Sequence, residues 1–204
     1  ITGEEASEST FTNFTIAGTL SLTANGIKLE DSNELTFENC YLTVGGQYGI
    51  YTTDGDGSTF DGNTISGPSS YGIYVSNGDD STVTSNEITV GGTGVSISNG
   101  EGSTVSSNII EATGSYGIEM NDCDDCLFDA NVITGRPSTG LQSTSSQDAT
   151  YTNNEMDVSR YGLNVGSGDQ LDIDFNTVTS FEQYGIRFYE SSDSTVTNNT
   201  LTSA

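Results

Sequence analysis

The sequence contains no histidine and no tryptophan, and only four of its 204 residues are lysine or arginine. Aspartate and glutamate number 29, which gives a formal net charge of −25 at pH 7. So acidic a surface repels phosphate groups, and nucleic acid and anionic membranes are therefore poor partners. No segment approaches the ~20 apolar residues that span a bilayer, so we expect no membrane insertion.

Hydrophobic residues are also scarce, at 32% of the chain, and proline occurs only twice, whereas glycine occurs 25 times. This composition lies close to that of disordered proteins, so a folded chain must place its few apolar residues at regular positions. The abundance of serine, threonine and asparagine and the lack of lysine favour an extracellular location. Because the chain begins with Ile1 rather than methionine, we expect a processed product or a fragment.

A short motif with a central glycine followed by an aliphatic residue recurs every 22 or 23 residues. Its copies are Asn25-Gly26-Ile27, Tyr48-Gly49-Ile50, Tyr71-Gly72-Ile73, Thr93-Gly94-Val95, Tyr116-Gly117-Ile118, Thr139-Gly140-Leu141, Tyr161-Gly162-Leu163 and Tyr184-Gly185-Ile186. Within each unit, apolar and polar residues alternate in three segments, which indicates short β-strands, two to four residues long, separated by turns. Such short strands bury a core only when the units stack on one another.

Aligning the units places apolar residues in three columns at fixed phase. The columns are Ile1, Ile27, Ile50, Ile73, Val95, Ile118, Leu141, Leu163 and Ile186; Phe11, Phe37, Phe60, Val83, Val105, Phe128, Tyr151, Ile173 and Val196; and Ile16, Leu42, Ile65, Ile88, Ile110, Ile133, Met156, Val178 and Leu201. The columns predict an all-β fold, a right-handed parallel β-helix of about nine coils with residues 1–204 as a single domain. With coils spaced like strands, at ~4.8 Å, this solenoid is a rod roughly 43 Å long.

One polar column accompanies the apolar ones, because asparagine occupies the same corner in seven consecutive units. These residues are Asn63, Asn86, Asn108, Asn131, Asn154, Asn176 and Asn199. A side-chain amide both donates and accepts hydrogen bonds, so the column can form a ladder, and asparagine tolerates the left-handed backbone of a sharp corner. With this ladder and its Gly-Ile-x-Val, Thr-Val-x-x-Asn and Ile-Thr segments, the chain resembles the right-handed parallel β-helix repeats of the pectin-lyase-like superfamily. The resemblance implies the fold for essentially the whole chain but no single activity, because such helices serve as lyases, epimerases, hydrolases, adhesins and fibres.

The three cysteines play different parts in this repeat. Cys40 takes the place of the ladder asparagine in its coil, so we expect a small buried side chain. Its separation from Cys126 along the axis is several coils, well beyond the ~7 Å reach of a disulfide. Cys123 and Cys126 are close enough for a local disulfide, and the C-x-x-C pattern is equally compatible with free thiols.

Few residues offer catalytic chemistry. Lys28, Arg136, Arg160 and Arg187 are the only lysine and arginine residues, and no dense acidic cluster accompanies them. Carboxylates recur at one turn of every coil, whereas a catalytic site would break the repeat once. We therefore expect no enzyme, with residues 121–126 as the best single-site candidate; acid–base cleavage by two carboxylates is the alternative.

The acidic turns suggest a metal-binding hypothesis. Calcium takes oxygen ligands from flexible acidic loops, and like charges ~4.8 Å apart repel by about 1 kcal/mol in water. Weak Ca²⁺ binding is therefore predicted at Asp54, Asp56, Asp122, Asp124 and Asp125, and solvated turns without metal are the alternative.

The outward residues form two further columns. Threonine recurs from Thr10 to Thr195, beside a column that mixes threonine with acidic residues. Tyrosine recurs beside the first strand, at Tyr48, Tyr71, Tyr116, Tyr161 and Tyr184. Stacked tyrosines can bind sugars, and stacking between coils explains them equally well. Asn13 and Asn198 match the acceptor pattern for N-glycosylation.

The two terminal coils lack a polar cap in the sequence. Apolar residues there include Ile1, Phe11, Phe14 and Ile16 at one end and Phe188, Val196 and Leu201 at the other. The open edge of a strand can pair with a strand of another chain. When the two ends of a molecule are complementary, each added copy leaves a free end for the next, so the assembly does not close. The sequence therefore predicts an extracellular structural or surface protein that stacks head to tail into a homopolymeric filament. The alternatives are a fragment whose caps lie in flanking residues and a carbohydrate-active β-helix that binds or cleaves an extracellular polysaccharide.

Overall fold

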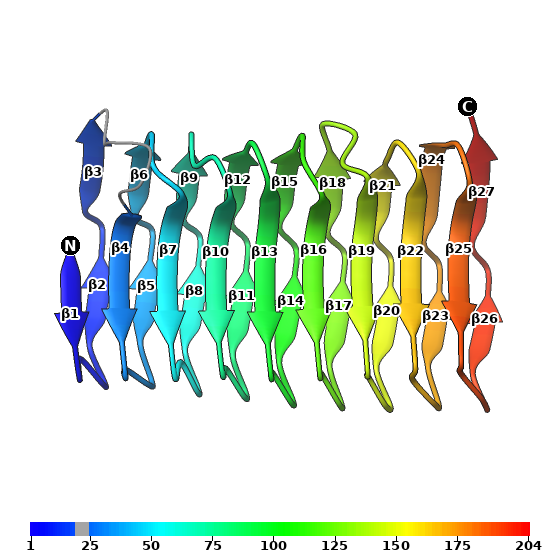
Figure 1. The fold of residues 1–204 in the computed structure, drawn as a ribbon, viewed down its shortest axis with the longest axis horizontal. Helices are drawn as coiled ribbons and strands as arrows, with labels where there is room; N and C mark the ends of the chain where they lie inside the picture. Colours follow the sequence, from blue (N-terminus) through cyan, green and yellow to red (C-terminus); the bar gives the residue numbers. More distant parts are fainter. Residues whose placement is uncertain (19–24) are drawn as a thin grey trace.

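The computed structural model describes residues 1–18 and 25–204. In this part of the chain, 27 strands form three parallel sheets of nine strands each, which run along the whole rod (Figure 1). Each coil contributes one strand to each sheet, so a strand pairs with the strand three places further along the chain. The prediction of an all-β parallel β-helix of about nine coils is confirmed.

We name the sheets A, B and C in the order in which a coil enters them. Sheet A contains β1 (Thr2–Glu4), β4 (Asn25–Glu30), β7 (Tyr48–Thr53), β10 (Tyr71–Ser76), β13 (Thr93–Ser98), β16 (Tyr116–Asn121), β19 (Thr139–Thr144), β22 (Tyr161–Gly166) and β25 (Tyr184–Tyr189). Sheet B contains β2 (Thr10–Thr12), β5 (Thr36–Glu38), β8 (Thr59–Asp61), β11 (Thr82–Thr84), β14 (Thr104–Ser106), β17 (Leu127–Asp129), β20 (Thr150–Thr152), β23 (Asp172–Asp174) and β26 (Thr195–Thr197). Sheet C contains β3 (Thr15–Gly18), β6 (Tyr41–Val44), β9 (Thr64–Ser66), β12 (Glu87–Val90), β15 (Ile109–Ala112), β18 (Val132–Thr134), β21 (Glu155–Asp157), β24 (Thr177–Phe181) and β27 (Thr200–Ser203).

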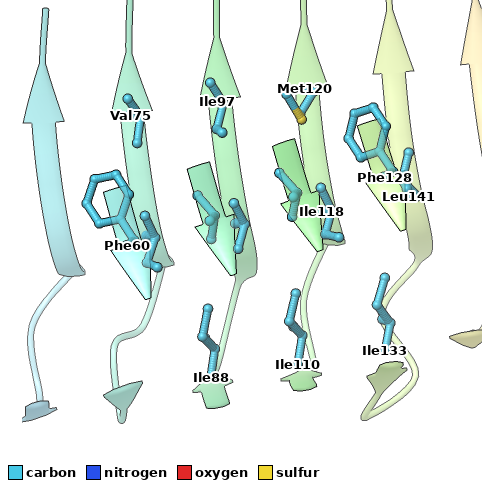
Figure 2. Close-up of a cluster of buried hydrophobic side chains, with 14 of the residues drawn as sticks. Phe60, Val75, Ile88, Ile97, Ile110, Ile118, Met120, Phe128, Ile133 and Leu141 are labelled. Atoms are coloured by element: carbon cyan, nitrogen blue, oxygen red, sulfur yellow. The ribbon is translucent and has the colours of Figure 1, made fainter. Parts of the chain in front are cut away.

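The core follows the apolar columns. Ile73 of β10 pairs in register with Ile50 and Val95 of the adjacent coils, and all three side chains are fully buried. Figure 2 shows side chains such as Phe60, Ile88 and Ile118 pointing into the space between the three sheets. Because each coil presents the same face to its neighbours, one continuous core forms from side chains that are few in any one coil.

The strands of sheet A are longer than predicted. From β4 onward each has six residues, because the residues flanking the Gly-Ile pair also join the ladder. Tyr71 pairs with Thr93, and Ser76 pairs with Ser98. The glycine of each motif sits where the coil enters sheet A, close to the next coil: a Cβ on Gly72 would lie 2.6 Å from the carbonyl oxygen of Gly94. The recurring glycine is therefore a packing requirement of the stack.

The corners correct one detail of the sequence interpretation. The left-handed residue at the corner between sheets B and C is the one before the ladder asparagine; Ser85, for example, has a φ of 56° and precedes Asn86. Most coils place a small or polar residue there, as expected for this conformation. Phe175 is the exception, with a φ of 54° and 59% of its surface exposed.

The asparagine ladder is confirmed. Asn108 Nδ2 donates to Asn131 Oδ1 at 2.9 Å and to the carbonyl of Val83 at 2.9 Å, and Asn108 Oδ1 accepts from Asn86. The same pattern joins the column from Asn63 to Asn199. Cys40 continues the column: it is buried, and its backbone N–H donates to Asn63 Oδ1 at 3.0 Å. No helix in residues 1–18 and 25–204 is long and apolar enough to cross a membrane.

Candidate functional site

The acidic turns use their carboxylates to join neighbouring coils. Asp56 Oδ1 accepts the backbone N–H of Asp79 at 3.1 Å, and Asp124 Oδ1 accepts that of Gln147 at 2.8 Å. Asp169 occupies the equivalent turn position in a later coil, and hydrogen bonds from Ser192 hold the pKa of its carboxyl group below the usual value. In the part of the chain that the structure describes, no three acidic or cysteine side chains converge as a metal site. Calcium binding at this edge stays a prediction.

The remaining candidates from the sequence lie apart from one another. Cys123 and Cys126 form a disulfide across one turn between sheets A and B, and Cys40 is a free, buried cysteine. Asn13 and Asn198 are exposed and occupy the same left-handed corner position in the first and last coils, each with a φ of 52°.

The side chains predicted at the two ends occupy the first and last coils. Phe11, Phe14 and Ile16 are partly buried against the core, whereas the others are more exposed. The exposed fractions are 56% for Ile1, 47% for Phe188, 41% for Val196 and 46% for Leu201.

The outer face of sheet A gathers the most varied chemistry in the described chain. Two outward columns cover it, and together we call them the tyrosine face. The first is Tyr48, Tyr71, Thr93, Tyr116, Thr139, Tyr161 and Tyr184, and the second is Lys28, Tyr51, Tyr74, Ser96, Glu119, Gln142, Asn164 and Arg187. The strand register places each residue beside its counterpart in the next coil, so the face is a direct consequence of the repeat.

At its N-terminal end the tyrosine face is an aromatic cluster. Tyr48 stacks on Tyr71 with ring centroids 5.3 Å apart, and Tyr51 stacks on Tyr74 at the same separation. The two stacks meet edge to face at 5.0 Å between Tyr48 and Tyr51. Lys28 extends the cluster, with its Nζ 5.5 Å from the Tyr51 ring and 2.7 Å from the Glu30 carboxylate. Partial burial raises the pKa of the Tyr48 and Tyr71 hydroxyls, so both are neutral donors at pH 7.

At the other end the face combines one aromatic stack with amides and guanidinium groups. Tyr161 stacks on Tyr184 at 5.9 Å, and its hydroxyl donates to Gln183 Oε1 at 2.6 Å. The guanidinium of Arg160 lies 5.1 Å from the Tyr161 ring, and that of Arg187 lies 6.0 Å from it. The register of sheet A brings both arginines to one tyrosine ring.

Two breaks in the first column lie in the middle of the face. Thr93 and Thr139 stand where the other coils from β7 onward carry tyrosine, and each is only 4% exposed. A hollow of about 230 Å³ opens at the second break, lined by Ser115, Tyr116, Ser138, Thr139, Gln142, Arg160, Tyr161 and Asn164. Sequence reasoning did not identify this hollow, although the Thr-Gly pairs among the Tyr-Gly motifs carried the signal.

One carboxyl group lies within the tyrosine face. Glu119 is half-buried, which raises its pKa, and Ser96 Oγ donates to its Oε2 at 3.4 Å. Its neighbours in the column are Ser96 and Gln142, so no second carboxylate is next to it. Glycoside hydrolysis commonly uses two carboxyl groups ~5–9.5 Å apart.

The three stacked sheets, the asparagine ladder and the repeating corner define a right-handed parallel β-helix protein. A family model described as "right handed beta helix region" matches residues 1–155 and 93–204, and the chain belongs to this family. A search of curated proteins finds no match.

Solved structures with the same fold include enzymes and an adhesin. DFA-IIIase from Arthrobacter chlorophenolicus A6, without its lid, matches with a TM-score of 0.50 and 12% identity over 93% of this chain and 61% of its own. The A-module of a mannuronan C-5 epimerase from Azotobacter vinelandii gives 0.43 and 12% over 88% and 58%. PfbA, a surface adhesin of Streptococcus pneumoniae, gives 0.30 and 9% over 87% and 62%. The chain thus spans about three fifths of the length of each, and these likenesses concern the fold alone.

Proposed function

We propose that this protein is an extracellular surface protein that binds a neutral saccharide on the tyrosine face without cleaving it. The observation that carries the proposal is the juxtaposition on one face of stacked tyrosines with amide, hydroxyl and guanidinium groups. A sugar ring has apolar C–H faces and a polar hydroxyl edge. Aromatic rings pack against the first, and amides and guanidinium groups bond the second.

The charge distribution supports a neutral ligand. A chain with net charge −25 repels anionic polymers at long range. Three of its four cationic side chains, Lys28, Arg160 and Arg187, nevertheless lie against tyrosine rings of this one face. Held there, the guanidinium groups supply fixed hydrogen-bond donors for hydroxyl groups.

Binding without cleavage is supported by the position of Glu119, which has no acidic neighbour in its column. An extracellular location is supported by the disulfide between Cys123 and Cys126, because disulfides persist mainly in oxidising compartments.

The test is binding of the intact protein to a panel of neutral and acidic polysaccharides, with matched tyrosine variants. Tyr71→Thr copies the threonine found at Thr93 in the same column, so the fold tolerates it. We expect it to weaken binding at least fivefold. Tyr41→Thr is the control, because Tyr41 is an exposed tyrosine of sheet C whose partner in the next coil is Thr64. Equal losses in both variants, no binding by the parent protein, or shortened glycan products would contradict the proposal.

We propose head-to-tail stacking as a second property. The last coil exposes Phe188, Val196 and Leu201, which belong to the same inward columns that the coils between the two ends bury. Two arrangements would cover this exposed end and continue all three sheets: the first coil of another copy, or additional coils of a longer chain. Electron microscopy and sedimentation over a range of concentrations distinguish the two. Rods that lengthen with concentration support stacking, and a monodisperse monomer at high concentration contradicts it.

A further inference from the structure

The hollow at Thr139 lies where the stack of tyrosine rings lacks one ring, because threonine takes the place of tyrosine in this coil. Tyr116 and Tyr161 lie on either side of it, one coil away in each direction. Coils are ~4.8 Å apart, so the two rings are roughly 10 Å apart. A flat ring placed midway lies ~5 Å from each, within the ~4.5–7 Å range of ring contacts. The gap therefore has room for one ring from outside the protein.

The polar lining of the hollow identifies the kind of ring. Apart from the two tyrosine walls, the hollow is lined by side chains that donate or accept hydrogen bonds. Gln142 and Asn164 are fixed by a mutual hydrogen bond of 2.6 Å, and Arg160 is held over the Tyr161 ring. A purely aromatic guest would leave these groups without partners, which is unfavourable for polar groups removed from water. A ring with apolar faces and a hydroxylated edge satisfies both the walls and the lining.

Thr139 forms the floor of the hollow. It is 4% exposed, and its hydroxyl forms no hydrogen bond with any described residue. Because Thr139 Oγ1 keeps some contact with solvent, it is available to a ligand that enters the gap. The hydroxyl groups of Ser115 and Ser138 also line the hollow and can bond the same ligand.

We infer that the hollow between Tyr116 and Tyr161 binds a single neutral pyranose ring, which completes the tyrosine stack in place of the missing side chain. This inference rests on the proposed saccharide-binding function and identifies its central subsite. The tyrosine rings stack along the rod axis, so the plane of the guest ring is perpendicular to that axis. Equatorial glycosidic bonds leave a pyranose close to its ring plane, so a chain joined to the bound ring through such bonds crosses the rod rather than following its axis.

The test fills the gap with the residue that the other coils carry. Thr139→Tyr restores the stack, and tyrosine is already present at this position in the flanking coils, so the variant is expected to fold with an unchanged or higher Tm. Tyr41→Thr is the control: it replaces an exposed tyrosine of sheet C, outside the tyrosine face, with the residue type found at its partner Thr64. Tyr161→Thr removes one wall and leaves Thr139 in place.

Saturation-transfer NMR with the methyl pyranosides of glucose, galactose, mannose and xylose provides the readout. We expect the parent protein to bind at least one of them. Both Thr139→Tyr and Tyr161→Thr should weaken it at least tenfold, and Tyr41→Thr should change it less than twofold. Binding by Thr139→Tyr within twofold of the parent overturns the subsite even if polysaccharide binding persists. If the parent binds neither the methyl pyranosides nor any polysaccharide, the proposed function fails with it.

Discussion

Removing one rung from the middle of the asparagine ladder should strongly destabilise the fold. In Asn108→Ala, two groups lose their partners: the backbone N–H of Asn86, which donates to Asn108 Oδ1 at 3.0 Å, and the carbonyl of Val83, which accepts from Asn108 Nδ2 at 2.9 Å. Asn86 and Asn108 are buried, so water does not readily replace either bond. At ~1–3 kcal/mol for each unsatisfied group, the free energy of unfolding should fall by about 2–6 kcal/mol.

Two other asparagines provide internal controls for the same substitution. Asn199 makes equivalent ladder bonds in the last coil but is only half-buried, so water can substitute and Asn199→Ala should lose ~1 kcal/mol or less. Asn99 also bonds to a neighbouring coil, because its Nδ2 donates to Asn77 Oδ1 of the preceding coil at 2.8 Å, but on the exposed turn between sheets A and B. Its loss should change stability by less than ~0.5 kcal/mol.

Urea denaturation followed by circular dichroism measures all three variants against the parent protein. The expected order of destabilisation is Asn108→Ala, then Asn199→Ala, then Asn99→Ala, with similar m-values if unfolding remains cooperative. Equal effects for Asn108→Ala and Asn99→Ala would refute the reasoning, because burial would then not decide the contribution of a ladder bond.

Three further predictions concern single features. The Tyr151 hydroxyl is buried near Ser143 and Ser146 without a hydrogen bond, because the two serines bond each other at 2.6 Å, and burial raises its pKa to about 12. The unfolded chain, with a tyrosine pKa of ~10, loses this proton first, so stability should fall by about 3 kcal/mol between pH 10 and 12. Tyr151→Phe should abolish this component in an alkaline denaturation series. Cys40→Asn should extend the asparagine ladder by one residue and raise the free energy of unfolding, measured in urea, by ~0.5–1 kcal/mol. The reason is that Cys40 Sγ already lies 3.2 Å from the Phe11 carbonyl oxygen, which an asparagine amide would reach. A loss of stability would show that the site cannot hold the larger side chain. If Ca²⁺ bridges the acidic turns around Asp54 and Asp122, the Tm should be higher in calcium than in EDTA at matched ionic strength, and identical values would remove that hypothesis.

The fold was predictable because every coil repeats the same pattern of apolar and polar residues. Inward residues such as Ile50, Ile73 and Val95 recur at one phase, and only stacked parallel strands bury all of them together. The ladder followed from the same alignment. Corner geometry was less accessible, because Asn86 and its left-handed neighbour Ser85 are both plausible turn residues, and only the backbone shows which one turns.

The candidate site was only partly predictable. The tyrosine column was visible in the sequence, but its second column was not identified as part of the same face. The hollow at Thr139 also depends on what lies one coil before and after it, which no single motif contains. Arg160 precedes the tyrosine motif and Arg187 follows it in the next coil, so their approach to one ring, that of Tyr161, emerges from strand register.

The most direct measurement of the central claim is a crystal structure of the protein soaked with the methyl pyranoside that it binds best. We expect one sugar ring between Tyr116 and Tyr161, with its edge bonded to Thr139 Oγ1 and its plane across the rod axis. A sugar bound on another face, or a hollow that stays empty while the saccharide binds elsewhere on sheet A, would contradict it.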